Sequence, residues 1–225
     1  MNALAQTWGR HALRVYLVTD ARLSLGRPLD EVVAAAVRGG ATCVQLREKA
    51  LPTRDFVAQA RALKAVLNAQ GVPLVINDRV DVALACGADG VHLGQSDMAV
   101  EDARRLLPPH VFIGWSVETP ADVQRAARLP VDCLGVSPVF ATPTKTDTHT
   151  PWGLDGLRQV RAATDLPLVA IGGIHAGNAL DVLRHGADGL AVVSAICSAP
   201  DPQAAAAELA ALCTAHFAAH FKDTP

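Results

Sequence analysis

The sequence predicts an α/β protein with a single (β/α)8 TIM-barrel domain covering residues 1–225. Short apolar runs alternate with helix-length segments eight times, which is the order of a repeated strand-helix unit. One phrase also recurs where a predicted helix ends and a strand begins, as Gly40-Ala41-Thr42-Cys43-Val44, Gly87-Ala88-Asp89-Gly90-Val91 and Gly186-Ala187-Asp188-Gly189-Leu190, with Val131-Asp132-Cys133-Leu134 as a fainter fourth copy. Eight units in 225 residues, with a mean period of about 25, match a barrel near the small end of its size range.

An open, doubly wound sheet is the alternative arrangement of such units. That fold normally carries a glycine-rich GxGxxG turn after its first strand, where the backbone approaches a dinucleotide. Here the corresponding residues 20–24 read Asp-Ala-Arg-Leu-Ser and contain no glycine. We therefore prefer the closed barrel.

The predicted strands are short and apolar, and the predicted helices are bounded by proline and glycine. The first strand is rich in β-branched and aromatic residues, and the first helix has proline at its start and two glycines beyond its end. After a lead-in over residues 1–12, we expect strands at 13–19, 41–46, 73–76, 90–93, 111–115, 131–136, 168–171 and 189–193. The helices are expected at 28–38, 52–70, 80–86, 99–107, 120–129, 154–163, 177–185 and 203–221.

The amino-acid composition argues against nucleic acids and membranes as binding partners. A net charge of −2, no block of Lys or Arg, and 4% aromatic residues argue against nucleic-acid binding. No apolar run approaches the roughly 18 residues of a membrane helix. The five cysteines are scattered through apolar runs without CxxC spacing, as in a reducing compartment. We expect a cytoplasmic protein that binds small molecules, with a homodimer as one expected form.

Two acidic residues follow neighbouring predicted strands. Asp78 comes just after strand 73–76, and Asp97 follows strand 90–93. Because parallel strands end at one rim of a barrel, the two carboxylates should face the same crevice. They repel each other unless a cation or proton lies between them, and Mg²⁺ is a suitable cation. The alternative is that Asp78 caps the next helix and Asp97 closes a turn.

The end of the second strand carries polar residues at alternate positions. Gln45, Arg47 and Lys49 should share one side of the chain, which favours an anionic ligand. A structural carboxylate such as Glu48 is the alternative partner for Arg47. Ser116, at the end of the fifth strand, offers a hydroxyl, or else caps the following helix.

The loop over residues 137–152 is long for a barrel connection, and such loops are often lids. It would carry Thr142, Thr144 and Lys145 over the mouth of the barrel, unless it is only a solvated polar loop. Gly173 and Ser194 follow the seventh and eighth strands, where this fold commonly binds phosphate.

No nucleophile or strong base stands out in the sequence. There is no GxSxG, Walker or HExxH motif, and we interpret His92, inside the fourth strand, as a core residue. The residues instead form two anion sites, one for a strongly charged group such as a diphosphate and one for a single phosphate. This suggests chemistry driven by metal and cation stabilisation of a leaving group.

Eight motifs, in order along nearly the whole chain, resemble the thiamine-phosphate synthase family. They are YLVTD at Tyr16–Asp20, VQLREK at Val44–Lys49, IND at Ile76–Asp78, GADGVHLGQSD at Gly87–Asp97, IGxS at Ile113–Ser116, PVFATPTK at Pro138–Lys145, IGGI at Ile171–Ile174 and VVSAI at Val192–Ile196. The resemblance implies that a hydroxymethylpyrimidine diphosphate is joined to a thiazole phosphate with release of diphosphate. It also implies a dissociative reaction, in which diphosphate departs first and the thiazole nitrogen captures a pyrimidinylmethyl cation.

The resemblance assigns roles by matching position. The pyrimidine diphosphate would be bound by Gln45, Arg47, Lys49, Asn77, Ser116 and Lys145, of which Arg47, Lys49, Ser116 and Lys145 form the catalytic set. Asp78 and Asp97 would hold Mg²⁺. The thiazole phosphate would be bound by Thr142, Thr144, Gly173, Val193 and Ser194.

Two residues depart from the family pattern, and two rival functions stay open. Trp115 and Ser137 stand where a smaller residue and a glycine are common, and they bear on the shape of the pyrimidine pocket. The first rival is a thiazole tautomerase, a paralogue that usually lacks the metal aspartates and the lid lysine and has a histidine where this chain has Pro138. The second rival is a non-catalytic phosphate-binding barrel.

Overall fold

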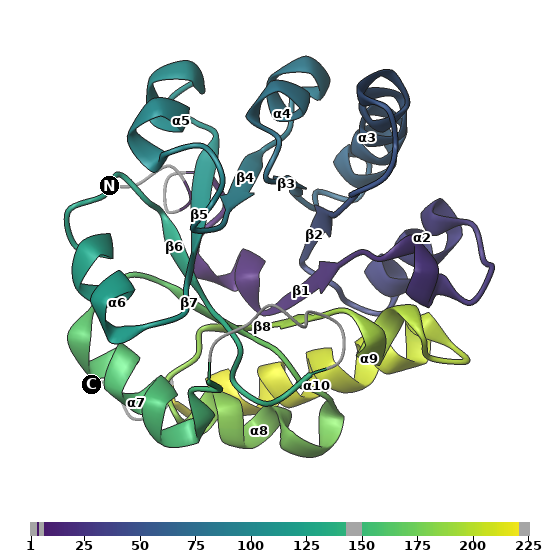
Figure 1. Ribbon diagram of the computed structural model, residues 1–225. Helices are drawn as coiled ribbons and strands as arrows, with labels where there is room; N and C mark the ends of the chain where they lie inside the picture. Colours follow the sequence, from purple (N-terminus) through teal and green to yellow (C-terminus); the bar gives the residue numbers. More distant parts are fainter. Residues whose placement is uncertain (1–3, 5–6, 143–149, 221–225) are drawn as a thin grey trace.

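The computed structural model describes residue 4, residues 7–142 and residues 150–220. Eight parallel strands close into a barrel, and helices surround it (Figure 1). Each strand pairs with the next in sequence, and β1 pairs with β8 to complete the ring. The predicted (β/α)8 barrel is therefore confirmed. Within the described ranges, no helix is both long and apolar enough to cross a bilayer.

The strands lie close to their predicted positions. They are β1 (Val15–Val18), β2 (Cys43–Leu46), β3 (Leu74–Asn77), β4 (Gly90–Leu93), β5 (Phe112–Val117), β6 (Cys133–Val136), β7 (Leu168–Ile171) and β8 (Gly189–Val192). The first strand is shorter than expected, because residues 10–13 form a 3-10 helix that leads into it. The fifth is longer and carries Ser116 inside it.

The helices follow the strands as expected. They are η1 (Arg10–Leu13), η2 (Ala21–Ser24), α2 (Leu29–Arg38), α3 (Thr53–Asn68), α4 (Val80–Cys86), α5 (Val100–Leu106), α6 (Pro120–Ala126), α7 (Gly153–Ala163), α8 (Ala176–Arg184), α9 (Ser194–Cys197) and α10 (Pro202–His220). The sequence did not predict η1 and η2, which are single turns. Helix α10 packs against both α2 and α8, which closes the helical ring.

Two groups of buried apolar side chains stabilise the barrel. The larger group lies between the strands and the helices and includes Trp115, whose indole is also covered by the guanidinium of Arg125 at 5.1 Å. The smaller group fills the barrel interior around Phe112 and Val75. Leu4, from the predicted lead-in, is fully buried in this interior group. The lead-in therefore contributes to the barrel interior.

The recurring phrase in the sequence has a structural explanation. In each of the four copies of the phrase, the residue just before β2, β4, β6 or β8 has a side-chain oxygen. This oxygen accepts a hydrogen bond from a backbone N–H at the start of the preceding strand, β1, β3, β5 or β7. The four bonds are Val15 N to Thr42 Oγ1 (2.9 Å), Leu74 N to Asp89 Oδ2 (2.8 Å), Ile113 N to Asp132 Oδ2 (2.7 Å) and Leu168 N to Asp188 Oδ2 (2.8 Å). These contacts satisfy backbone donors at the amino-terminal end of the barrel and leave the opposite end for a site.

Candidate functional site

A cavity of about 580 Å³ opens where the strands end. All the predicted site residues that fall within the described part of the chain line it, namely Gln45, Arg47, Lys49, Asn77, Asp78, Asp97, Ser116, Thr142, Gly173, Val193 and Ser194. Thr144 and Lys145 lie outside the described residues. The carboxyl ends of the strands thus bring together residues that are far apart in the sequence.

Asp78 and Asp97 lie next to each other in the wall of this cavity, close enough for a hydrogen bond between their carboxyl groups. Asp78 follows β3 with a left-handed backbone (φ 62°), and its N–H donates to the carbonyl of His92 at 2.8 Å. Burial raises the pKa of Asp97, and hydrogen bonding and repulsion from the Asp78 carboxylate raise that pKa further. This is the arrangement that favours a cation or proton between two carboxylates.

Of the two alternative roles, a helix cap for Asp78 and a turn for Asp97, only the second is found. The N-cap of α4 is Arg79, and no side chain caps that helix, so Asp78 is not a helix cap. Asp97 does close a turn, because its Oδ2 accepts the N–H of Gly94 at 2.7 Å. One carboxylate oxygen of Asp97 is therefore occupied by the backbone.

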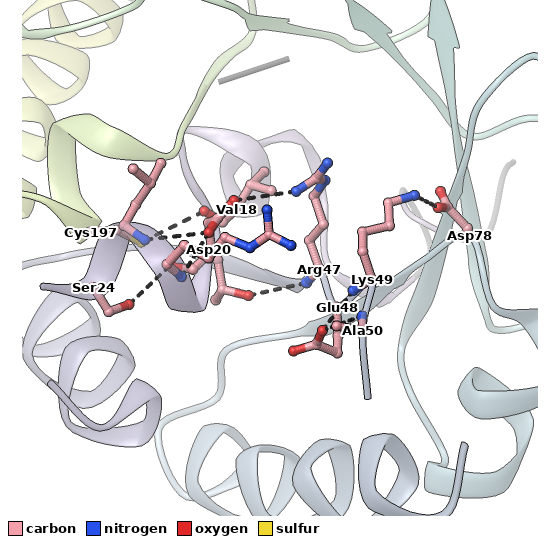
Figure 2. Close-up of polar contacts among 12 residues, drawn as sticks. Val18, Asp20, Ser24, Arg47, Glu48, Lys49, Ala50, Asp78 and Cys197 are labelled. Carbon is pink, nitrogen blue, oxygen red and sulfur yellow. Dashed lines mark hydrogen bonds and ion pairs between the residues drawn. The ribbon is translucent and has the colours of Figure 1, made fainter. Parts of the chain in front are cut away.

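The cations at the end of β2 are paired with carboxylates (Figure 2). The ammonium of Lys49 contacts Asp78, and Nη1 of Arg47 lies 3.4 Å from Oδ2 of Asp20. Glu48 is not the partner of Arg47, because its Oε1 accepts the N–H of Lys49 at 2.7 Å. Both cations keep partly exposed side chains at the rim, within reach of an anion in the cavity.

Amide and phenol groups line the inner part of the cavity. Gln45 Nε2 donates to the hydroxyl of Tyr16 at 3.0 Å. Asn77 Oδ1 is buried and has no hydrogen-bond partner among the described residues. An unsatisfied buried carbonyl oxygen is costly, so this atom points to a ligand that donates to it or coordinates it. Burial raises the pKa of Tyr16 and of the Cys133 thiol, so both stay protonated and the cavity has no thiolate there.

Ser116 is held in the cavity and does not cap the next helix. The N-cap of α6 is Thr119, whose side chain forms a capping box with Asp122. Ser116 Oγ lies 3.0 Å from His92 Nε2, and its carbonyl accepts from Gln95 Nε2 at 2.6 Å. The hydroxyl is therefore available to a ligand at the end of β5.

The other side of the cavity is formed mainly by backbone. Gly172 and Gly173 have positive φ values of 102° and 66°, and a Cβ on Gly173 would lie 2.8 Å from Phe140 Cβ. Val193 and Ser194 begin the short helix α9 at the same rim. The space that a side chain would fill at the two glycines is taken by residues Pro138–Ala141, so the glycines let the start of the long loop pack against the end of β7.

The described ends of the long loop dock on this side. Val139 is fully buried, and its N–H donates to the carbonyl of Ile171 at 2.8 Å. The N–H of Trp152 returns to the carbonyl of Pro138 at 2.9 Å. The lid prediction depends on residues 143–149, which lie outside the described residues, and it stays a prediction.

Two further observations concern the shape and chemistry of the cavity. Ser137 lines it, whereas Trp115 points toward the helices and does not. The described residues contain no group of three or more His, Cys, Asp or Glu arranged to hold a metal. A Mg²⁺ ion needs only one or two carboxylates together with water and phosphate oxygens, so Asp78 and Asp97 fit it as donors.

The structure also adds residues that the sequence analysis did not assign to the site. Tyr16, His92, Gln95 and Glu118 line the cavity. His92 is half-buried and is not the enclosed core residue that we expected. Side chains alternate between the two faces of strand β4, and this alternation predicts that His92 points into the barrel. Alternation alone does not show whether an inward side chain lies in the cavity or in the packed interior.

Comparisons with known proteins agree with one another. A family model described as thiamine monophosphate synthase matches residues 15–196. The chain is 71% identical over 208 residues to a thiamine-phosphate synthase from Albidiferax ferrireducens, covering 92% of this chain and 95% of the relative. It is 52% identical to a thiamine-phosphate synthase from Vibrio parahaemolyticus, covering 90% and 98% of the two chains.

Solved structures support the same fold, and one of them also supports the same family. A thiamine phosphate pyrophosphorylase from Pyrococcus furiosus superposes with a TM-score of 0.85 at 39% identity, covering 92% of this chain and 98% of that chain. A 3-hexulose-6-phosphate synthase superposes with a TM-score of 0.62 at 19% identity, covering 89% and 99% of the two chains. The second likeness supports the fold alone.

Proposed function

The chain belongs to the thiamine monophosphate synthase family, and we propose that it joins two phosphorylated heterocycles into thiamine phosphate. The substrates are 4-amino-2-methyl-5-(diphosphooxymethyl)pyrimidine and 4-methyl-5-(2-phosphoethyl)thiazole, and the second product is diphosphate. The enzyme is a transferase of the pyrimidinylmethyl group. The proposal depends on one observation: a single cavity gathers the adjacent carboxylates and the cations of β2 at the carboxyl ends of the strands.

The diphosphate is proposed to bind at the acidic and basic rim. Asp78 and Asp97 would hold Mg²⁺, which would neutralise charge on the leaving group when it is bound. Arg47 and Lys49 would contact the diphosphate directly, and Lys145 would join them from the loop. Their partial exposure at the rim of the cavity supports this role, because each can reach an incoming anion.

The pyrimidine is proposed to lie deeper, between Gln45, Asn77 and Ser116. The buried Oδ1 of Asn77 supports this placement, since an amino group or a metal-bound water would satisfy it. The thiazole phosphate would bind at the opposite rim, on Gly173, Val193 and Ser194 together with Thr142 and Thr144. The position of Gly173, Val193 and Ser194 in the wall of the cavity, with Ser194 in the first turn of α9, supports contact with a phosphate.

The proposed reaction is dissociative. The bond between the methylene carbon and the diphosphate oxygen breaks first, and the thiazole nitrogen then bonds to the pyrimidinylmethyl cation. The leaving diphosphate takes the electron pair, so the step needs stabilisation of negative charge and no strong base.

The two rival functions are less well supported. A thiazole tautomerase would need a histidine before the Val139-Phe140 pair, and Pro138 occupies that position. A non-catalytic phosphate-binding barrel would not require the adjacent carboxylates of Asp78 and Asp97.

A product assay tests the proposal. The purified protein is mixed with both substrates, with and without Mg²⁺, and thiamine phosphate and diphosphate are measured by mass spectrometry and a coupled assay. We expect equimolar products that need both substrates and the metal. Isomerised thiazole without diphosphate would favour the tautomerase, and binding without turnover would favour the non-catalytic barrel.

A further inference from the structure

His92 occupies a slot that two neighbouring strands leave open. Its ring extends from β4 over Gly114 of β5 and Gly135 of β6. A Cβ on Gly114 would lie 2.6 Å from His92 Nδ1, and a Cβ on Gly135 would lie 2.9 Å from Cε1. Any other residue at either position would displace the ring. Glycine in a strand interior lowers stability, so the space for the His92 ring has a cost in stability at two positions.

A second glycine that leaves room for a ring on a neighbouring strand lies closer to the base of the barrel. There, Gly90 makes room for Phe112, because a Cβ on Gly90 would lie 2.7 Å from the phenyl ring. Phe112 is apolar, almost fully buried and part of the interior packing. His92 is polar, half-buried and lines the cavity. Packing therefore explains the slot for Phe112 and not the slot for His92.

The ring at this slot contacts the hydroxyl of Ser116. His92 Nε2 lies 3.0 Å from Ser116 Oγ, and Gln95 Nε2 donates to the Ser116 carbonyl at 2.6 Å. Both contacts come from β4 and the turn that follows it. Ser116 is thus held through its side chain and its main chain by one segment.

The direction of the His92–Ser116 bond decides what the hydroxyl can do. A serine hydroxyl has one proton to donate. If His92 accepted that proton, Ser116 would present only lone pairs to a diphosphate, and these repel an anion. If His92 donates from Nε2, the hydroxyl proton is free to point at the anion.

We propose that His92 is a positioning residue that donates from Nε2 to Ser116 Oγ and thereby directs the serine proton toward the leaving diphosphate. The inference rests on the proposed function and adds a residue to it. His92 acts through Ser116 and does not itself exchange a proton with substrate. The glycines at 114 and 135 are part of the same arrangement, because they fix the ring.

Matched variants of His92 separate positioning from packing. His92→Leu fills the slot without a hydrogen bond, whereas His92→Gln restores an amide donor near the position of Nε2. We expect His92→Leu to lower kcat by about 10- to 100-fold, with the KM of the thiazole phosphate within about threefold of wild type. His92→Gln should recover most of that loss. Phe112→Leu, which loosens only the interior packing, should leave kcat within about threefold.

A double-mutant cycle tests whether His92 acts through Ser116. The variant His92→Leu/Ser116→Ala should be no more than about threefold slower than Ser116→Ala alone, because the hydroxyl that His92 orients is already absent. Multiplicative effects on kcat would overturn the inference, as would equal losses in His92→Leu and His92→Gln at matched thermal stability.

A measurement on the resting protein does not depend on turnover. The ¹⁵N chemical shifts of His92, assigned by their loss in His92→Gln, should report a proton on Nε2 and should change in Ser116→Ala. A proton on Nδ1 alone would overturn the proposed bond direction, even in an active enzyme. An inactive wild type with the expected shifts would instead count against the proposed function and leave the His92–Ser116 bond standing.

Discussion

The ammonium of Lys49 contacts the carboxylate of Asp78, so the ends of β2 and β3 are joined by an ion pair at the mouth of the barrel (Figure 2). Arg47 is held in a similar way by Asp20 at 3.4 Å. The proposed diphosphate-binding cations are thus balanced by carboxylates of the chain itself. Because Asp78 is also a proposed Mg²⁺ ligand, the metal and Lys49 would compete for it. Metal entry would release Lys49 toward the diphosphate.

Lys49→Met tests this competition. We expect the affinity of the free enzyme for Mn²⁺, used as a paramagnetic substitute for Mg²⁺, to stay the same or increase, because Asp78 loses its competitor. The KM for the pyrimidine diphosphate should rise by about tenfold or more, since a charged hydrogen bond is lost. Metal binding is measured by electron paramagnetic resonance. Lys64→Met is the control, because Lys64 pairs with Asp89 away from the cavity and should change neither quantity. Weaker Mn²⁺ binding in Lys49→Met would contradict the competition.

Removing either of the two adjacent carboxylates should weaken the metal site. In Asp78→Asn and Asp97→Asn, the Mg²⁺ concentration for half-maximal rate should rise by at least about tenfold. Loss of a residue that only supports a metal ligand already weakens metal binding by about 10- to 100-fold, so loss of a ligand should cost at least as much. Mg²⁺ titration of the initial rate is the measurement. Asp81→Asn removes an exposed acid that pairs with Arg79 and serves as the control. An unchanged titration in Asp78→Asn would refute its role as a ligand.

Lys145→Ala should reduce kcat more than it affects thiazole binding. We expect a loss of about 10²- to 10³-fold in kcat, because charge develops on the diphosphate as it leaves. Lys145→Arg keeps the charge and should recover part of the rate. Steady-state kinetics in both substrates checks this. A rise in the KM for thiazole phosphate with kcat intact would move Lys145 to the other anion site.

Ser194→Ala should weaken the thiazole phosphate selectively. One neutral hydrogen bond is lost, so its KM should rise by roughly 2- to 12-fold while the KM for the pyrimidine diphosphate is unchanged. Ser198→Ala is a matched control four residues away, because the Ser198 hydroxyl donates to the carbonyl of Leu23 and does not line the cavity. If the pyrimidine diphosphate were affected instead, the two phosphate sites would have to be exchanged.

Much of the fold could be predicted because local signals and topology agree. The helix Val80–Cys86 and the strand Gly90–Leu93 lie where the sequence predicted them, bounded by a glycine in a left-handed conformation at Gly87. Once the barrel was predicted, the carboxyl-end rule placed Asp78 and Asp97 at one rim without any further information.

Three features of the structure could not be predicted, because they depend on contacts between residues that are distant in the sequence. The slot for His92 is created by Gly114 and Gly135 on other strands, so the histidine by itself looked like a core residue. Leu4 is a single apolar residue in a mostly polar segment, and nothing local indicates that it enters the barrel. We expect Trp115 to bear on the shape of the pyrimidine pocket, but the register of β5 turns it toward the helices.

The contact between Asp132 and the start of β5 gives a prediction about stability. Asp132 is buried, its Oδ2 accepts the N–H of Ile113 at 2.7 Å, and Arg104 lies 3.9 Å from the same oxygen. Asp132→Ala should lower the free energy of unfolding by about 1–3 kcal/mol, because the N–H of Ile113 stays buried without its partner. Asp132→Asn keeps an acceptor and should lose less. Urea unfolding followed by circular dichroism measures the change, with Asp102→Ala, an exposed acid on α5, as the control. If Asp132→Ala unfolded at the wild-type urea concentration, the repeated phrase would have no role in holding the base of the barrel, and the four side chains that share this position would need another explanation.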